Sequence, residues 1–325
     1  MAKPPAAERL ADAVGRHLAA PVRIEGLRRL SGGASRETWT FDAAPADGGT
    51  PLGLVLRRDP GADAGPGARA AEFELILAAD PAGVPVPAAR FLLEPGDDLG
   101  TGFVMDRIEG ETIPRKILRD DQYASARPRL ARQCGEILAR LHTLGPGVAA
   151  LPTLSPRELL DQYREILDGL GEPHPAFELG LRWLAERVPD NGRTTLVHGD
   201  FRNGNLVVGS DGVRAVLDWE LAHFGDPMED LGWLCVKSWR FGVVDKLVGG
   251  FGDLDDLFAA YEDAGGAPVD PEAVGYWIAF GTLKWGVICE MQAFAHLHGI
   301  VRSVEQATIG RRVAEMEWDL LDLLA

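Results

Sequence analysis

The chain has 325 residues, and 46% of them are hydrophobic, which is enough apolar material to fill one large domain or two lobes that share a cleft. Its formal net charge of -16 would repel nucleic acid phosphates and anionic membrane surfaces, and no Lys- or Arg-rich run offsets that charge locally. We therefore expect neither nucleic acid nor a membrane as a partner. The charge would attract a cationic small substrate, although solubility is the simpler explanation.

Neither the apolar stretches nor the cysteines point to a membrane-bound or secreted protein. The longest apolar stretch, Ala273 to Leu283, stops at Lys284, well short of the ~20 residues that a membrane span needs. Residues 1–9 lack an apolar segment followed by a small-residue cleavage site, so we expect no secretory signal and a cytoplasmic location. The three cysteines are far apart and form no CxxC pair, which disfavours disulfides and a zinc site. We expect buried thiols at Cys134, Cys235 and Cys289.

The N-terminal third is typical of a small sheet with one helix. Its strand-like segments are separated by clusters of Gly, Pro and Asp. Expected strands cover residues 23–30, 38–41, 52–57, 90–93 and 103–108. Within residues 68–79, Ala71, Leu75 and Ile76 recur at helical spacing, and the prolines of residues 81–87 then end the helix.

The sequence after Glu109 is mostly helical. One expected helix has its apolar face between Leu130 and Leu141, and a second has its apolar face between Leu159 and Leu170. The second begins with a capping box formed by Ser155 and Glu158. An extended interruption covers residues 194–217, and helices resume after Asp226. The pattern predicts an α+β protein with a small sheet lobe over residues 1–108 and a large helical lobe over residues 109–325.

The strongest motif lies in the extended interruption. Asp200 follows His198-Gly199 and precedes Asn205 by five positions, which is the spacing of a kinase catalytic loop. Residues 206–208 and 213–217 flank a Gly-containing turn, so we expect a β-hairpin that returns Asp218 close to Asn205. Directly paired residues of antiparallel strands lie roughly 4.5–5.5 Å apart, close enough for an amide oxygen and a carboxylate to share one Mg²⁺.

These three residues fit the needs of phosphoryl transfer. A carboxylate must orient the acceptor hydroxyl and take its proton, and a divalent metal must neutralise charge on the triphosphate. We assign Asp200 the first task, as catalytic base, and Asn205 and Asp218 the second, as Mg²⁺ ligands. Any one of them alone would more often be a turn residue or a helix cap, but the three together favour the catalytic interpretation.

These motifs and two further stretches resemble the aminoglycoside phosphotransferase and choline kinase superfamily. The added stretches are Leu217-Asp-Trp-Glu220 and the segment from Gly225-Asp226-Pro227 to Trp233. Nearly the whole chain fits this resemblance, which implies a two-lobed protein-kinase-like fold. Within the superfamily, the Asp-Trp-Glu and Gly-Asp-Pro stretches are most similar to the phosphotransferase domain fused to some eukaryotic acyl-CoA dehydrogenases.

The resemblance implies that residues 1–108 bind the nucleotide, ATP, and that residues 109–325 carry the catalytic and substrate-binding site. The segment that contains Gly32, Gly33 and Ser35 resembles the nucleotide-positioning loop of the family, whose glycines let backbone N–H groups approach phosphates.

Two further parts of the nucleotide site follow from the same resemblance. Arg57 corresponds to the basic residue of the third strand, where Lys is more common, and Glu72 to its carboxylate partner on the next helix. The segment from Phe103 to Gly110 resembles the hinge, where the carbonyl of Asp106 and the N–H of Ile108 would meet the adenine edge.

Other residues near the motifs receive structural roles or remain candidates for the acceptor site. We expect Asp226 and Asp230 to cap helices and support the catalytic loop, and His198 to support the loop as well. The C-terminal helices of the family shape acceptor specificity. Candidate acceptor residues are Trp277, Trp285, Glu290 and the segment 219–223, although core packing explains the two tryptophans equally well.

The sequence thus predicts an ATP-dependent phosphotransferase that moves the γ-phosphate to a hydroxyl of a small molecule. Aminoglycosides, choline-like amines, sugars and hydroxyacyl thioesters all remain open as acceptors, and GTP remains open as donor. An inactive, nucleotide-binding scaffold is the alternative. A protein kinase is disfavoured because no Ala-Pro-Glu motif follows Asp218, and no Walker loop, GxSxG or HExxH motif occurs.

Overall fold

The structure is a computed structural model that describes residues 5–30, 37–59, 66–190 and 192–325. The chain forms two compact units. Unit 1 comprises Met1–Gly110, Gly147–Ala150 and Arg214–Glu220, and unit 2 comprises Glu111–Pro146, Leu151–Val213 and Leu221–Ala325. Asp218 therefore belongs to unit 1, whereas Asp200 and Asn205 belong to unit 2.

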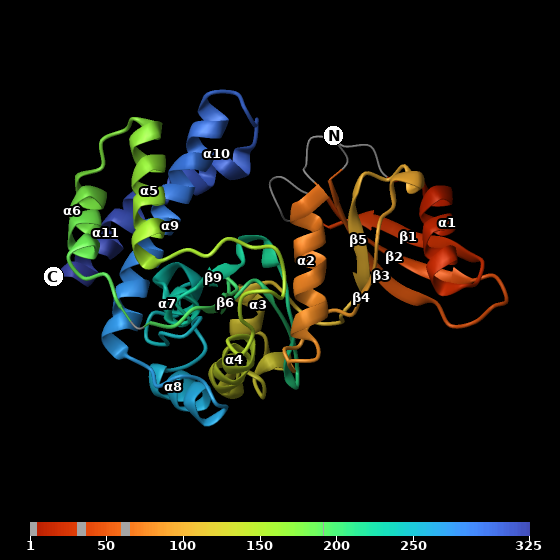
Figure 1. The fold of residues 1–325 in the computed structure, drawn as a ribbon, viewed down its shortest axis with the longest axis horizontal. Helices are drawn as coiled ribbons and strands as arrows, with labels where there is room; N and C mark the ends of the chain where they lie inside the picture. The colour runs from red at the N-terminus through yellow and green to blue at the C-terminus, as the bar shows by residue number, and fades with distance from the viewer. Residues whose placement is uncertain (1–4, 31–36, 60–65, 191) are drawn as a thin grey trace. The chain divides into compact units, whose positions relative to one another are not determined.

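Unit 1 is built on an antiparallel five-stranded sheet with the strand order β1-β2-β3-β5-β4. Its strands are β1 (Val22–Arg29), β2 (Glu37–Pro45), β3 (Leu52–Asp59), β4 (Ala89–Leu92) and β5 (Thr101–Asp106). Helix α1 (Ala7–Leu18) packs against β1, and helix α2 (Pro66–Ala79) packs against β4 and β5 (Figure 1). The strands predicted from the sequence are all present, and β5 ends at Asp106, before Ile108.

The two faces of the central strand β3 have different partners. Leu54 and Leu56 are buried in a core that also contains Leu10 of α1. Because successive side chains of a strand point to opposite faces, Arg57 points away from that core, and it pairs with Glu72 of α2. Helix α1 was not predicted from the sequence. It has no side-chain hydrogen bond at its N-cap residue Ala6, so the usual start signal is missing.

Unit 2 is mainly helical. Its α-helices are α3 (Pro114–Arg119), α4 (Arg127–Leu141), α5 (Pro156–Leu170), α6 (Pro175–Ala185), α7 (Met228–Cys235), α8 (Leu254–Asp263), α9 (Pro271–Leu297), α10 (Val304–Gly310) and α11 (Val313–Leu324). Helix α9 contacts α5, α6, α7, α10 and α11, which makes it the central helix of this unit (Figure 1). Its buried side chains accordingly face several directions.

The extended interruption contains short strands. Strand β6 (Thr195–Val197) pairs with β9 (His223–Gly225), and β7 (Leu206–Gly209) forms a two-stranded sheet with β8 (Gly212–Val216). The predicted hairpin is therefore present, and the chain passes from unit 2 into unit 1 along β8. The loop that contains Asp200 joins β6 to β7.

Two smaller predictions are confirmed. Helix α5 has the capping box, since the Glu158 N–H donates to Ser155 Oγ and the Ser155 N–H donates to the Glu158 carboxylate. Cys134, Cys235 and Cys289 are buried free thiols. In the described part of the chain, no helix combines the length and the apolar character needed to cross a membrane.

Candidate active site

The Asp200 carboxylate is fixed by three donors. Its Oδ1 atom accepts hydrogen bonds from Arg202 Nε at 2.9 Å and from Trp233 Nε1 at 2.8 Å. Its Oδ2 atom accepts one from Asn205 Nδ2 at 2.6 Å. The side chain is only 13% exposed, so these donors hold the carboxylate in one orientation. The structure thus brings together Asp200 and Asn205, two of the residues predicted from the sequence.

The orientation of the Asn205 amide follows from the same contacts. Its Nδ2 atom donates to both the backbone oxygen and the carboxylate of Asp200, at 3.0 and 2.6 Å. The amide oxygen, which carries the lone pairs of the group, therefore points away from Asp200. An amide oxygen is a suitable ligand for a hard cation such as Mg²⁺.

The backbone before Asp200 is held by Asp230 at the start of α7. The N–H groups of His198 and Gly199 donate to the Asp230 carboxylate at 2.8 and 3.0 Å. Gly199 has φ +75°, and a Cβ atom there would lie 2.4 Å from the carbonyl oxygen of Leu221, so the position requires glycine. The predicted support of the loop by Asp230 is confirmed.

Asp230 is itself anchored by a buried chain of polar groups. His142 Nε2 lies 3.2 Å from the Asp230 carboxylate, and His142 Nδ1 lies 2.9 Å from the Tyr261 hydroxyl. Burial of Asp230 alone would raise its pKa, but the hydrogen bond with His142 and the charges of His142 and His198 hold that pKa below its usual range. Asp230 is therefore a charged and fully buried anchor.

We expect Asp230→Ala to destabilise unit 2. The substitution leaves two backbone N–H groups and His142 without their acceptor inside the protein, and loss of one partner from a buried charged pair costs about 3–5 kcal/mol. Urea unfolding measures this loss. Asp322→Ala, on the exposed face of α11, is the matched control and should leave the unfolding midpoint unchanged. Equal midpoints for both variants would contradict the anchoring role.

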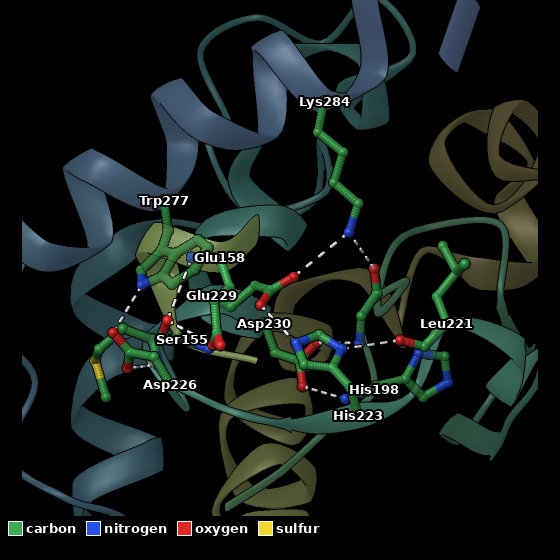
Figure 2. Close-up of polar contacts among 12 residues, drawn as sticks. Ser155, Glu158, His198, Leu221, His223, Asp226, Glu229, Asp230, Trp277 and Lys284 are labelled. Carbon is green, nitrogen blue, oxygen red and sulfur yellow. Dashed lines mark hydrogen bonds and ion pairs between the residues drawn. The ribbon is translucent and has the colours of Figure 1, made fainter. Parts of the chain in front are cut away.

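Figure 2 shows a second buried polar cluster, formed by His223, Glu229 and Lys284. His223 Nε2 lies 3.0 Å from Glu229 Oε2, and the Lys284 ammonium lies 3.4 Å from Glu229 Oε1. The same ammonium donates to the carbonyl oxygen of Gly199 at 3.0 Å. The sequence did not identify Glu229 or Lys284 as parts of the site.

The His223–Glu229 pair makes a pH-dependent contribution to stability. Burial lowers the pKa of His223, but the charge of Glu229 and its hydrogen bond outweigh burial and raise that pKa above the ordinary value of 6.5. Because the folded pKa is the higher one, the contribution is complete below pH 6.5 and is lost as pH rises through the folded pKa.

The test is the unfolding free energy of the wild type and of His223→Gln between about pH 6 and about pH 9. The wild type should be the more stable protein at the acidic end, and the difference should shrink as pH rises. A difference that is constant or grows with pH would contradict the assigned direction.

Asp226 and Trp277 form a structural contact. Asp226 Oδ1 accepts from the Met228 N–H at 2.9 Å, at the start of α7, and Asp226 Oδ2 accepts from Trp277 Nε1 at 2.8 Å. Trp277 is only 1% exposed, so core packing, rather than an acceptor site, accounts for it. Asp226 thus accepts from the first N–H of α7, although the N-cap residue of that helix is Pro227, which makes no side-chain cap.

In unit 1, Arg57 joins two carboxylates. Its NH1 atom lies 3.1 Å from Glu72 Oε1, and its NH2 atom donates to Asp218 Oδ1 at 2.9 Å. Glu72 also pairs with Arg69, at 2.6 Å. The sequence did not single out Arg69. Burial lowers the pKa of Arg57, but the charges of Glu72 and Asp218 raise it above the usual range. The expected Arg57–Glu72 pair is present, and Asp218 is a further partner.

The remaining predicted site residues have different surroundings. Asp218 has φ +69°, an uncommon value for a residue other than glycine and one that is often found at functional sites. Asp106 is the last residue of β5, and its carboxylate forms two hydrogen bonds with Arg90, both of 2.6 Å. Ile108 follows that strand and is half-buried. Gly32, Gly33 and Ser35 lie outside the described residues.

The metal ligands predicted from the sequence are one carboxylate, Asp218, and one amide, Asn205. Both offer oxygen, the donor that Mg²⁺ prefers, and the Asp218 side chain is 34% exposed. Within residues 5–30, 37–59, 66–190 and 192–325, no group of three or more His, Cys, Asp or Glu side chains could hold a metal ion. The oxygen donors of the two predicted ligands fit Mg²⁺.

Comparison with known proteins gives three informative similarities. The chain is 29% identical to acyl-CoA dehydrogenase family member 10 of Mus musculus over 82% of this chain, but it spans only 27% of that protein. It is 28% identical to 4-hydroxytryptamine kinase of Psilocybe cyanescens, over 74% of this chain and 75% of the kinase. A solved structure from Ralstonia eutropha, assigned as an aminoglycoside phosphotransferase, is 22% identical with a TM-score of 0.75 and covers 98% of both chains.

These similarities agree with the architecture. The Ralstonia likeness concerns the fold, and it confirms the predicted α+β, kinase-like class. Residues 26–267, well over half of the chain, match the family described as phosphotransferase enzymes. That stretch includes Arg57, Glu72, Asp200, Asn205 and Asp218. The chain belongs to the phosphotransferase enzyme family.

Proposed function

We propose that this protein transfers the γ-phosphate of ATP to a hydroxyl group of a small molecule, with Asp200 as the catalytic base. The observation that carries the proposal is the Asp200 carboxylate, held by Arg202, Asn205 and Trp233 in a loop whose backbone is anchored by Asp230. A base must be fixed within hydrogen-bond reach of the proton that it removes, and such an arrangement meets that need.

Each residue then has a defined task. Asp200 orients the acceptor hydroxyl and takes its proton as the new P–O bond forms, while the bond from the γ-phosphorus to the bridging oxygen of ADP breaks. Mg²⁺, when bound with ATP, would neutralise charge on the phosphates. Asn205 and Asp218 would hold that ion, and Arg57 would hold the phosphates while Glu72 keeps its guanidinium in place.

The acceptor class is a hydroxyl-bearing small molecule. Similarity to 4-hydroxytryptamine kinase extends over three quarters of both chains, so an amine-containing acceptor is a natural first candidate. Aminoglycosides, choline-like amines, sugars and hydroxyacyl thioesters complete the set to be tested. The division into a nucleotide-binding lobe over residues 1–108 and a catalytic lobe over residues 109–325, the hinge contacts of Asp106 and Ile108, and the cytoplasmic location stay predictions.

A screen of these acceptors for ADP release tests the proposal. At least one acceptor class should raise ADP release above the rate with ATP alone, and Asp200→Asn should reduce that increase by at least about 100-fold. The alternative, a nucleotide-binding scaffold without activity, requires ATP binding with no acceptor-dependent turnover. An intact set of Asp200, Asn205 and Asp218 argues against that alternative.

A further inference from the structure

Gly199 is held at both of its polar backbone groups. Its N–H donates to Asp230 Oδ1 at 3.0 Å, and its carbonyl oxygen accepts from the Lys284 ammonium at 3.0 Å. The carbonyl belongs to the peptide group that leads directly into Asp200. The position of this peptide therefore depends on α9, more than eighty residues further along the chain.

The burial of Lys284 is costly unless its charge is used. Its side chain is 5% exposed, and an unpaired ammonium in that environment would be strongly destabilising. Glu229 supplies the opposite charge at 3.4 Å, and the Trp233 ring lies under the ammonium at 4.5 Å from its centroid. An apolar residue would fill this space at a lower cost in desolvation, so packing alone does not account for a lysine here.

Two routes connect Lys284 to the Asp200 carboxylate. The first is the hydrogen bond to Gly199 O, which fixes the backbone next to Asp200. The second passes through Trp233, because the ring that contacts the ammonium also donates its N–H to Asp200 Oδ1 at 2.8 Å. Figure 2 shows the ammonium of Lys284 directed from α9 toward Glu229 and the loop. Displacement of this one group would disturb both the backbone and a donor of the base.

We propose that Lys284 is a positioning residue for the phosphotransferase reaction. It positions Asp200 through its contacts with Gly199 and Trp233, and Glu229 balances its charge. The inference rests on the proposed function of Asp200 as base. Lys284 itself touches neither of the reacting groups in this account. Its role is to hold the carbonyl group of Gly199 while Asp230 holds the N–H group of the same residue.

The first test is steady-state kinetics of Lys284→Met and of the double variant Lys284→Met/Glu229→Gln. The double variant removes both charges together, so it remains a fair test if the single variant fails to fold because Glu229 has lost one of its two buried partners. We expect kcat to fall by about 100-fold in the folded variant, with KM for ATP unchanged, because a small misplacement of a catalytic group has effects of that order. Lys246→Met, an exposed lysine paired with Asp253, is the control and should retain wild-type kcat.

The second readout is the split between kcat and KM. Loss of the positioning contacts should lower kcat and leave KM for ATP unchanged, because Lys284 acts on Asp200 through Gly199 and Trp233 and not on the nucleotide. A merely structural role would lower the amount of folded enzyme and leave kcat per folded molecule at the wild-type value.

Hydrogen exchange of the peptide that spans residues 198–205 completes the test and needs no acceptor. Exchange should be at least about tenfold faster in the double variant than in the wild type, since the loop has lost one of its two anchors. If the wild type phosphorylates an acceptor but the double variant matches it in kcat and loop exchange, the role of Lys284 is refuted. If no acceptor is phosphorylated by the wild type but loop exchange rises as expected, the proposed function fails while the anchoring of the loop by Lys284 is supported.

Discussion

Asp200→Asn should reduce kcat by about 10²–10⁴-fold and leave ATP binding nearly unchanged, which is the scale of a general-base contribution. Asparagine keeps the shape of the side chain and an acceptor oxygen for the Arg202 and Trp233 donors, although it replaces the oxygen that accepts from Asn205 by an NH2 group. It removes the charge and the capacity to take a proton. Kinetics with a working acceptor and calorimetric titration of ATP would measure the two effects separately.

A matched substitution controls for charge alone. Asp255→Asn removes a carboxylate from the exposed surface of α8 and should retain wild-type kcat and ATP affinity. Full turnover by Asp200→Asn would show that Asp200 is not the base. If ATP affinity falls and kcat falls by no more than ATP affinity does, Asp200 belongs to the nucleotide site instead.

Asp218→Asn should weaken magnesium-dependent ATP binding by at least about tenfold, and kcat should fall with it. Removal of a residue that only hydrogen-bonds to a metal ligand lowers metal affinity by about 10–100-fold, and removal of a ligand itself should lower it by no less. The substitution also removes the charge that Asp218 shares with Arg57. Calorimetric titration of ATP with and without Mg²⁺ separates the two contributions.

Glu72→Gln is the informative control for that experiment. It removes the other carboxylate partner of Arg57 but no proposed metal ligand, so it should weaken ATP binding similarly with and without Mg²⁺. Asp218→Asn should show its main loss only with Mg²⁺ present. If Asp218→Asn keeps magnesium-dependent binding and Asp200→Asn loses it, the roles of the two aspartates are reversed.

The parts that were predictable from the sequence carry local signals. The Asp200 to Asn205 spacing, the glycine turn between β7 and β8 and the capping box of α5 each occupy a few consecutive residues. Such signals depend on backbone and side-chain preferences that act over one turn. The fold class was predictable for a related reason. Strand signals dominate the first third of the sequence and helical periodicity dominates the rest, which separates the sheet from the helices.

The groups that hold the site in place were not predictable in the same way. Lys284 reaches Gly199 across 85 positions, and Asp230 reaches it across 31. In the sequence, Lys284 interrupts an apolar helix and could equally have marked an exposed face. Only the packing of α9 against α7 brings its ammonium to the loop. The same holds in unit 1, where Arg57 was expected to pair with Glu72 but its contact with Asp218 spans 161 positions.

The most direct test of the central claim follows the phosphate itself. The wild-type protein would be incubated with magnesium, an acceptor that stimulates ADP release, and ATP labelled with ¹⁸O in its γ-phosphate, and the products would be analysed by mass spectrometry. Our account predicts an acceptor that has gained one phosphate carrying the label, formed in equal amount to ADP, and formed at least about 100-fold more slowly with Asp200→Asn. Label found only in inorganic phosphate, with the acceptor unchanged, would contradict it.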